Sequence, residues 1–421
     1  MWRVRTICVL GFCLFIVCTP VEAQQVLTWQ QIKEKFEAAN PTLRAGRIGI
    51  DESKAQEITA YLRPNPDFTV IVDQFALFPD PISGAPYRPL AALFPLVEGS
   101  YLHERHHKRE LRRESARKAT DVAVSSLEDQ ERNLLFTLRG SFVQALQAKS
   151  VLALARENLA YWDHVLDLSR DRFKAGDISQ LDLDRLEIQR ATYESDAQTA
   201  EVNVRTAKIQ LLNLLNDRTP IDQFDISGAF DFSEQLGSLD EFRREALDSR
   251  PDLKAALLSV DKAKTDHQLA VANGSTDPTF GADLGRNPPL ASYIGFSMNI
   301  PLRFFDKNQG EKLRTQLDIS RSERLLDANQ SQVFSDVDSA YTMLNGTLNL
   351  LRPYKTKYLV QAAKVRDTVS FAYQRGAVSL LDFLNAQSDY RTIQVAYLNL
   401  VGSFLNAASQ LNLAVGREVI Q

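Results

Sequence analysis

Two short segments, 200 positions apart, carry the residues with the clearest chemical potential. Glycine, serine and aspartate recur in them at the same spacing: Gly176, Ser179 and Asp182, then Gly376, Ser379 and Asp382. Glycine tolerates the positive φ angle that a tight reversal between two helices requires. A carboxylate at the start of the returning helix complements the helix dipole, and an exposed one can also attract cations. The spacing therefore predicts two helical tips, at about 173–180 and 373–380.

The other candidate group for chemistry contains three of the five histidines: His103, His106 and His107. Imidazole is a common metal ligand, so a metal site is one interpretation. Adjacent residues such as His106 and His107 diverge on a helix, however, and the segment around them mixes both signs of charge. We therefore predict a solvated or interfacial cluster, with no bound metal or cofactor. No nucleotide-binding loop, nucleophile elbow or zinc motif occurs elsewhere, so the chain is not expected to be an enzyme.

The first 23 residues are expected to be a secretory signal peptide. Arg3 and Arg5 form a basic start, an apolar run follows, and the segment ends in Val21-Glu22-Ala23, which is typical of a cleavage site. All three cysteines lie in this segment, so the remaining chain can form no disulfide and no thiolate metal site. Lipidation at Cys18 is the alternative interpretation, but bulky residues precede this cysteine where a lipidation site normally has small ones.

Charge and hydropathy exclude two further classes of protein. The formal net charge is −4, so there is no basic excess to bind nucleic acid. No stretch after residue 23 stays apolar over the ~18 residues or more that a membrane-spanning helix requires. We therefore expect no membrane-spanning helix after residue 23.

The chain reads as two matched halves. The sequence around Pro41 resembles that around Pro251, and each half opens on a capping-box pattern: Thr28 with Gln31, and Ser238 with Glu241. We predict a first repeat over residues 24–220, a linker or equatorial segment over 221–237, and a second repeat over 238–421. Such internal repetition indicates one structural unit used twice.

Between these landmarks the pattern is helical. No proline interrupts residues 104–174, and a coiled-coil spacing of three and four residues joins Leu152, Ala155, Leu159, Trp162 and Leu166. A helix of that length would extend ~100 Å, which exceeds an ordinary globular core and predicts an extended bundle or tube. Residues 307–374 are similar.

Each half also carries a pair of predicted strands, at about 67–78 and 93–102, then 278–285 and 293–300. In the second pair apolar residues alternate with small or polar ones, which is typical of a membrane barrel strand and also of a soluble sheet with one wet face. Four strands are too few to close a barrel, and an open sheet edge is not tolerated in lipid. If these strands lie in a membrane, several chains must share one barrel.

The order of helices, strand pairs and tips, repeated twice, resembles the TolC-type outer membrane efflux proteins. The run from Ile300 to Gly310 resembles the strand-to-helix junction of the CzcC-like, cation-efflux branch. The resemblance implies a mainly helical fold with a small β part. It also implies a homotrimer in which four strands per chain form a shared 12-stranded barrel in the bacterial outer membrane. Long antiparallel helices would form a trimeric α-barrel in the periplasm, in which residues 41–63 and 180–216 would stack end to end as one interrupted helix.

The resemblance also implies a role for the tips as the periplasmic entrance and the docking site for an adaptor protein. In the family, a tyrosine before the second tip bonds to an aspartate after the first, and Tyr373 and Asp182 occupy these positions. Asp382 would form a ring of three carboxylates in a trimer. Some members carry another aspartate one turn later, where this chain has Asn385, so cation binding at the ring is expected to be weaker. Asp182 and Asp382 can act in the gate, as helix caps, or as both.

We therefore predict an exit duct that passively conducts substrates from a periplasmic adaptor and an inner-membrane pump. The expected pump is of the resistance-nodulation-division type. Metal cations or small toxic compounds are the expected cargo. Two alternatives remain open from sequence: a duct for protein secretion by an ATP-driven pump, and a periplasmic coiled-coil scaffold or adaptor without a pore.

Overall fold

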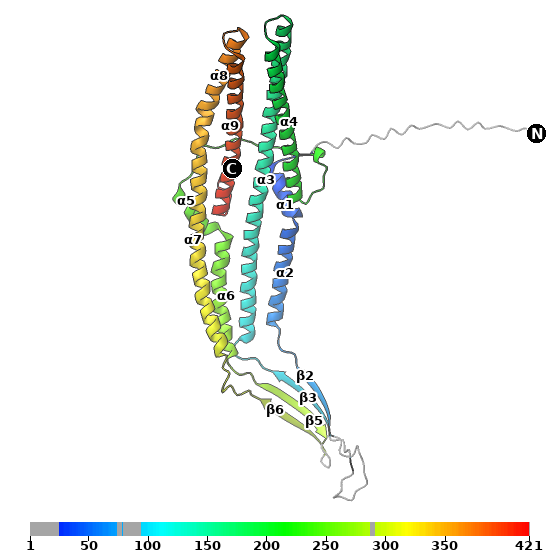
Figure 1. The fold of residues 1–421 in the computed structure, drawn as a ribbon. Coiled ribbons are helices and arrows are strands. Elements are labelled where there is room, and N and C mark those ends of the chain that lie inside the picture. The colour runs from blue at the N-terminus through cyan, green and yellow to red at the C-terminus, as the bar shows by residue number, and fades with distance from the viewer. Residues whose placement is uncertain (1–24, 74–77, 79–93, 287–290, 421) are drawn as a thin grey trace, which may run out of the picture.

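The computed structural model describes residues 25–73, 78, 94–286 and 291–420. The described part is an elongated row of helices with a small sheet at one end (Figure 1). The expected signal peptide and Cys18 lie outside the described residues, as do positions 74–77 of the first expected strand. Among the described helices, none combines the length and apolar character needed to cross a membrane.

The first repeat is built around one long helix. After α1 (Trp29–Ala39) and α2 (Pro41–Tyr61), two strands lead into α3 (Lys108–Lys174), which has 67 residues. The chain then reverses into α4 (Gln180–Leu214). α2 and α4 follow the two halves of α3, as Figure 1 shows, so together they act as one interrupted partner helix. This is the stacking expected for residues 41–63 and 180–216.

The second repeat has the same plan, with its helices at α5 (Leu239–Ser249), α6 (Pro251–Asn273), α7 (Gln309–Pro353), α8 (Leu359–Gln374) and α9 (Leu380–Val415). The long element is α7 continued by α8, and α6 and α9 are its shorter partners. Between α7 and α8 lies a single π-helical turn, η2 (Tyr354–Tyr358), directly after Pro353. Proline lacks the N–H that would continue the α-helical ladder, which explains a local change of winding at this point.

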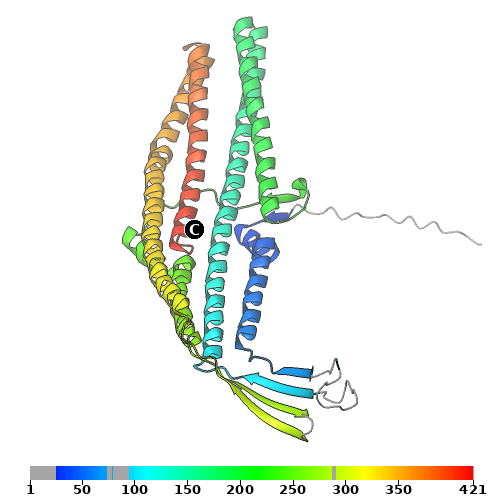
Figure 2. The ribbon, with the colours of Figure 1, turned by 60° about the horizontal axis from the view of Figure 1, so that its bottom comes forward.

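Four antiparallel strands form one sheet in the order β2-β3-β5-β6. Their bounds are Asp67–Asp73, Phe94–Leu102, Thr279–Arg286 and Ser292–Asn299. β3 and β5 pair across the two repeats, with Leu96 opposite Gly285 and Leu102 opposite Thr279. Figure 2 shows the strands side by side in a curved sheet beyond the helices. Both repeats therefore contribute to one continuous surface.

The two faces of this sheet differ in chemistry. On one face the side chains are apolar and exposed: Phe280, Leu284, Ile294, Phe296 and Met298. Along β5 and β6 the other face carries mostly small or polar residues, such as Gly281 opposite Ser297, and Glu98 of β3 stands opposite Asp283 on it. Ile71 and Leu96, which pair with each other, are apolar residues of the same face. In a soluble sheet the apolar face would be covered by other parts of the protein. Here it is open to the surroundings, which matches a sheet whose apolar face meets lipid.

A second, two-stranded sheet joins the start of the chain to the linker between the repeats. β1 (Gln25–Leu27) pairs in parallel with β4 (Phe224–Ile226), which follows the short 3-10 helix η1 (Ile221–Gln223). Phe224 and Ile226 are buried in the core of the first repeat. Neither strand is predictable from sequence, because three residues carry no recognisable alternation.

The helix starts show how local sequence sets the boundaries. The N–H of Thr28 donates to Gln31 Oε1 at 2.9 Å, and Ser238 Oγ accepts from the N–H of Glu241 at 3.3 Å. Each bond is one of the two hydrogen bonds that define a capping box, at the two places where the sequence predicts one. Pro41 and Pro251 each stand at the first helical position, where a missing N–H costs nothing.

Three apolar clusters hold the helices together. Two lie at the middle of the molecule, one in each repeat, around Phe142 and Phe404. The third lies toward the tips and contains Trp162, which is 1% exposed and stacks on Tyr193 with ring centroids 5.1 Å apart. Trp162 and Leu166 belong to the coiled-coil spacing found in the sequence. The tips therefore project from a packed aromatic base.

The predicted histidine cluster lies where the sheet joins the helices. His103, His106 and His107 are exposed, and His106 and His107 both have positive φ angles, 56° and 55°. In the described part of the chain, no group of three or more histidine, aspartate or glutamate side chains could hold a metal ion, and these histidines form none. His106 and His107 lie in a turn, and both side chains are exposed.

Candidate functional site at the helical tips

Both tips reverse direction at a glycine with a positive φ angle. Gly176 has φ of +84° and Gly376 has φ of +71°. At the first tip the N–H of Asp177 donates to the Arg172 carbonyl at 2.9 Å, and at the second the N–H of Ala377 donates to the Ala372 carbonyl at 2.9 Å. This bond across six residues is typical of a helix that ends on a left-handed glycine. The repeated glycines thus set the two turns in the same way.

The serines of the repeated pattern cap the returning helices. Ser179 Oγ accepts from the N–H of Asp182 at 3.1 Å, and Ser379 Oγ accepts from the N–H of Asp382 at 3.2 Å. In the second tip the box is reciprocal, because the N–H of Ser379 donates to Asp382 Oδ2 at 3.2 Å. Ser179 and Ser379 therefore cap the two helices, and the Asp382 carboxylate completes the capping box at the second tip, whereas the Asp182 carboxylate accepts from the Ser179 hydroxyl at 2.9 Å. This arrangement leaves Asp382 and Asn385, one turn further, exposed on the side of α9.

The two tips face each other across an open cleft of about 690 Å³. Arg172 and Arg185 line it together with Asp177 and Asp182, so both signs of charge are present. Tyr373 and both tip glycines also line the cleft. The structure therefore gathers Gly176, Ser179 and Asp182 with Tyr373, Gly376 and Ser379 around one space, while Asp382 and Asn385 do not border it.

Tyr373 is held by its ring. The ring stacks on Phe383 with centroids 4.8 Å apart and an interplanar angle of 16°, and the Arg172 guanidinium lies 5.6 Å from its centroid. Among the described residues, Tyr373 makes no hydrogen bond to Asp182. The pKa of Tyr373 is nevertheless raised, first by burial and further by the negative charge of Asp182, while Arg172 acts in the opposite direction. The expected pair is thus close enough to interact electrostatically, without direct bonding in this chain.

Sequence reasoning missed several residues at this site. Leu181 and Leu381 occupy equivalent positions in the two tips and are exposed, 59% and 63% respectively. Their equivalence could have been found from the same offset of 200 that identified the glycines. Gln387 is buried, and its Nε2 donates to Tyr161 Oη at 2.9 Å and to Ser370 Oγ at 3.1 Å. No sequence signal links these three residues, since they come from three different helices.

Gly376→Ala should loosen the second tip through the backbone alone. A Cβ at Gly376 meets no atom within 4 Å, so the cost comes from the left-handed φ angle, about 1–2 kcal/mol. Amide hydrogen exchange of residues 372–383 should therefore become roughly tenfold faster, if local opening limits exchange. Gly346→Ala within α7 is the control: its Cβ also meets nothing, but its φ angle is helical, so exchange should slow or stay unchanged. Equal behaviour of the two variants would contradict this account.

The family model described as outer membrane efflux protein matches residues 242–417, which include the second tip. The cobalt-zinc-cadmium resistance protein CzcC of Cupriavidus metallidurans is 22% identical over 417 residues, covering 94% of this chain and 92% of CzcC. The pyoverdine export outer membrane protein OpmQ of Pseudomonas aeruginosa is 26% identical over 302 residues, covering 68% of this chain and 62% of OpmQ.

Solved structures share the whole arrangement. CusC superposes with a TM-score of 0.76 at 15% identity and covers 92% of both chains. The MtrE outer membrane channel of Neisseria gonorrhoeae gives a TM-score of 0.73 at 16% identity, covering 93% of this chain and 89% of MtrE. The resemblance inferred from the repeated tips and strand pairs is confirmed. The second repeat of this chain is thus similar to the outer membrane efflux proteins over residues 242–417, and the chain has the fold of the solved outer membrane channels.

Proposed function

We propose that three copies of this chain form the exit duct of a tripartite efflux system, joined to a periplasmic adaptor and an inner-membrane pump. The observation that carries this proposal is the four-stranded sheet with one exposed apolar face. Four strands cannot close, but three such sheets supply the twelve strands of a small barrel. The helices then continue the barrel as a tube, and the tips form its far end. A periplasmic scaffold without a pore would have no use for an exposed apolar sheet.

Exposed leucines at the tips support docking of the adaptor there. Leu181 and Leu381 stand in the first turn of α4 and α9, beside the cleft that the glycine turns border. Exposed apolar side chains at equivalent places in both repeats favour a partner that repeats its own contacts around the ring. A pump of the resistance-nodulation-division type fits this architecture, and we propose it as the energy source.

We propose metal cations as the cargo. The alignment with CzcC spans 94% of this chain, whereas the alignment with OpmQ of Pseudomonas aeruginosa spans 68%. The polar face of the sheet also carries Glu98 and Asp283 directly opposite each other, and the described strands place no lysine or arginine on that face. Acidic side chains along a pore favour cations over anions.

Single-channel conductance in planar bilayers tests the duct and its gate together. We expect low conductance and cation selectivity from the wild type. Tyr373→Phe with Asp182→Ala should raise conductance several-fold. The double variant removes the hydroxyl and the carboxylate of two residues that line the cleft, and it keeps the aromatic stack on Phe383. Asp184→Ala is the control, since Asp184 is exposed in the same helical turn but does not border the cleft.

Each outcome of the bilayer experiment separates one part of the proposal from another. Conductance that is unchanged in the double variant would retain the channel and remove the gate. Anion selectivity would contradict the metal cargo. A folded protein that shows no conductance at all would favour the scaffold.

A further inference from the structure

The apolar face of the sheet does not stop where the strands end. After β6, Leu302, Phe304 and Phe305 lie in the connection to α7, and Phe305 is 93% exposed. These side chains extend the apolar surface toward the first turn of the helical tube. Exposed aromatic residues at the border of an apolar band are typical of the membrane interface. The inference that follows rests on the proposed membrane position of the sheet.

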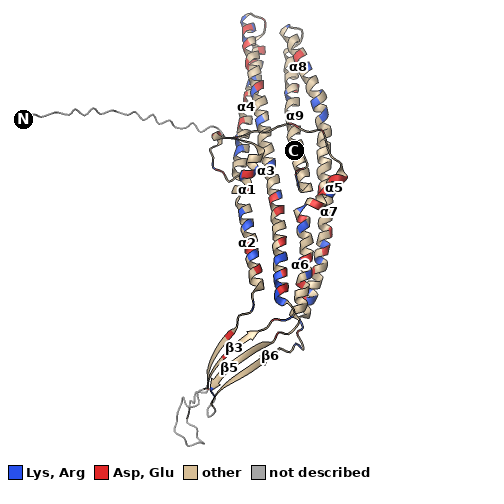
Figure 3. Cartoon of the chain, turned by 180° about the vertical axis from the view of Figure 1, so that it is seen from behind, with Lys and Arg blue, Asp and Glu red and all other residues tan. Residues whose placement is uncertain are grey.

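Basic residues gather directly beyond this border. Residues 103–118 contain seven lysines and arginines, three glutamates and three histidines. Figure 3 shows this concentration of positive charge at the end of α3 nearest the sheet. We define the junction collar as six cationic and imidazole side chains of this segment, all exposed or half-exposed: His103, Arg105, His106, His107, Arg109 and Arg113.

The ion pairs at the junction show which of these charges are already used. Lys108 is buried and bonds to Asp277 Oδ2 at 2.6 Å, and Arg112 pairs with Glu104. Arg109 pairs with Glu110 at 2.9 Å. Within the described residues, the guanidiniums of Arg105 and Arg113 have no carboxylate partner. The buried pairs therefore fix the turn, and the collar retains unneutralised positive charge.

An aromatic ring holds part of the collar in position. The guanidiniums of Arg109 and Arg113 lie 4.4 Å and 4.6 Å from the centroid of the Tyr61 ring, which ends α2. Stacking on a ring face leaves the N–H groups at the edge of a guanidinium free to donate. Phosphate oxygens are preferred acceptors for such a fork.

We infer that the junction collar binds the phosphate groups of anionic phospholipids in the membrane leaflet nearest the helical tube. The exposed aromatic side chains would lie among the acyl chains and the arginines at headgroup level. Charge complementarity selects this occupant, because an anionic headgroup combines a phosphate with a net negative charge, and a zwitterionic headgroup has no net charge to neutralise the unpaired guanidiniums. The exposed turn at His106 and His107 belongs to this lipid surface rather than to a metal site.

Native mass spectrometry of the purified channel, released from detergent with equimolar phosphatidylglycerol and phosphatidylcholine, tests this inference. We expect the wild type to retain phosphatidylglycerol preferentially. Arg105→Gln with Arg113→Gln should reduce that preference roughly tenfold, since each basic residue at a membrane surface contributes to anionic lipid binding. Arg105→Lys with Arg113→Lys keeps the charge and should keep most of the preference.

The matched control is Arg44→Gln with Arg47→Gln. These arginines are also exposed and lie on α2, but roughly 20 Å further from the sheet than Tyr61 along the helix. The control variant should behave as the wild type does. No preference in the wild type, or the same loss in the control, would overturn the inference. Conductance is measured in parallel: a conducting channel without lipid preference would refute the collar alone, and a non-conducting protein that still selects phosphatidylglycerol would refute the duct alone.

Discussion

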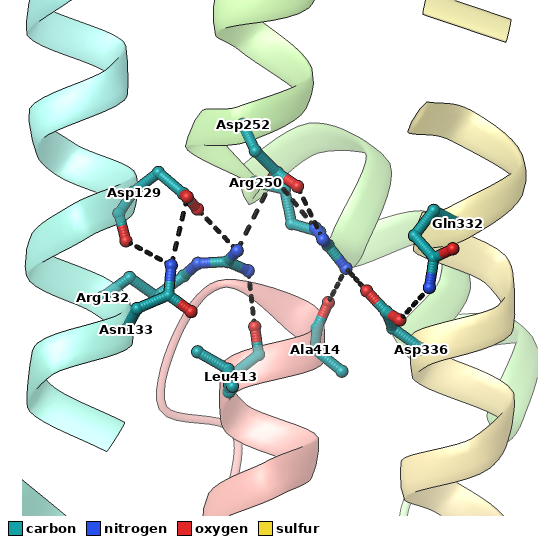
Figure 4. Close-up of polar contacts among 9 residues, drawn as sticks. All are labelled: Asp129, Arg132, Asn133, Arg250, Asp252, Gln332, Asp336, Leu413 and Ala414. Carbon is teal, nitrogen blue, oxygen red and sulfur yellow. Dashed lines mark hydrogen bonds and ion pairs between the residues drawn. The ribbon is translucent and has the colours of Figure 1, made fainter. Parts of the chain in front are cut away.

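Arg250→Met should lower the free energy of unfolding by about 3 kcal/mol, the largest loss we expect from any single substitution outside the strands. The Arg250 side chain is 5% exposed and connects three helices (Figure 4). It donates to both carboxylate oxygens of Asp252 on α6, at 3.0 and 2.6 Å, and to Asp336 on α7 at 2.8 Å. Methionine keeps the apolar stem but leaves both carboxylates without this partner.

The end of α9 adds to this cost. Arg250 also donates to the Ala414 carbonyl at 3.3 Å, and Arg132 from α3 donates to the Leu413 carbonyl at 2.6 Å. Carbonyls in the last helical turn accept no hydrogen bond from within the helix, and positive charge near them complements the helix dipole. The two arginines thus attach the end of α9 to α3, α6 and α7, as Figure 4 shows.

Arg243→Met is the matched control. Arg243 also reaches α7, where it donates to both oxygens of Asp338 at 2.8 and 2.7 Å. Its side chain is 35% exposed, so water can replace the lost bonds and the expected loss is below about 1 kcal/mol. Thermal unfolding followed by circular dichroism of the purified protein would compare the two. Equal losses would contradict the role assigned to burial.

The effect of Arg250 should also depend on pH. Burial opposes ionisation of Asp252, but the hydrogen bonds from Arg250 dominate and hold the pKa of Asp252 below its ordinary value of 3.8. A carboxyl whose pKa is lower in the folded state stabilises the protein above its unfolded pKa and loses that contribution as pH falls through the folded value. The difference between wild type and Arg250→Met should therefore be constant near neutral pH and shrink below about pH 4.

Phe296→Arg should prevent stable insertion of the channel into the outer membrane, while Ser297→Arg should permit it. Phe296 is 86% exposed on the apolar face and stands opposite Ala282 on β5. An arginine facing lipid near the membrane centre costs about 2–4 kcal/mol in each chain. Ser297 is its neighbour on the polar face, opposite Gly281 and near the side chain of Glu98, so an arginine there meets water and a carboxylate.

Outer-membrane fractions analysed by gel electrophoresis with and without heating would measure this difference. The wild type and Ser297→Arg should yield heat-sensitive trimers, and Phe296→Arg should yield monomers or no protein in the membrane. Insertion of Phe296→Arg at wild-type levels would place the exposed face against something other than lipid. Loss of both variants would indicate that the whole sheet, rather than one face, is sensitive to added charge.

Local sequence was sufficient for the elements that depend on neighbouring residues. The absence of proline through α3 permits its 67 residues, and Gly176 and Gly376 mark turns because only glycine adopts the left-handed conformation without strain. The alternation in β5 and β6 defined the two faces of the sheet before any pairing was known. These features are short-range, so the order of residues alone specifies them.

Tertiary structure decided the features that depend on residues distant in the chain. The pairing of β1 with β4 joins segments about 200 residues apart, and each strand is too short to show a pattern. Arg250 looks like an ordinary residue before a helix until α7 and α9 bring Asp336 and the Ala414 carbonyl to it. Tyr373 was expected to bond to Asp182, but packing directs its ring onto Phe383. Periodicity determines which face of an element is buried, whereas the partner that meets each side chain is set only when several elements pack together.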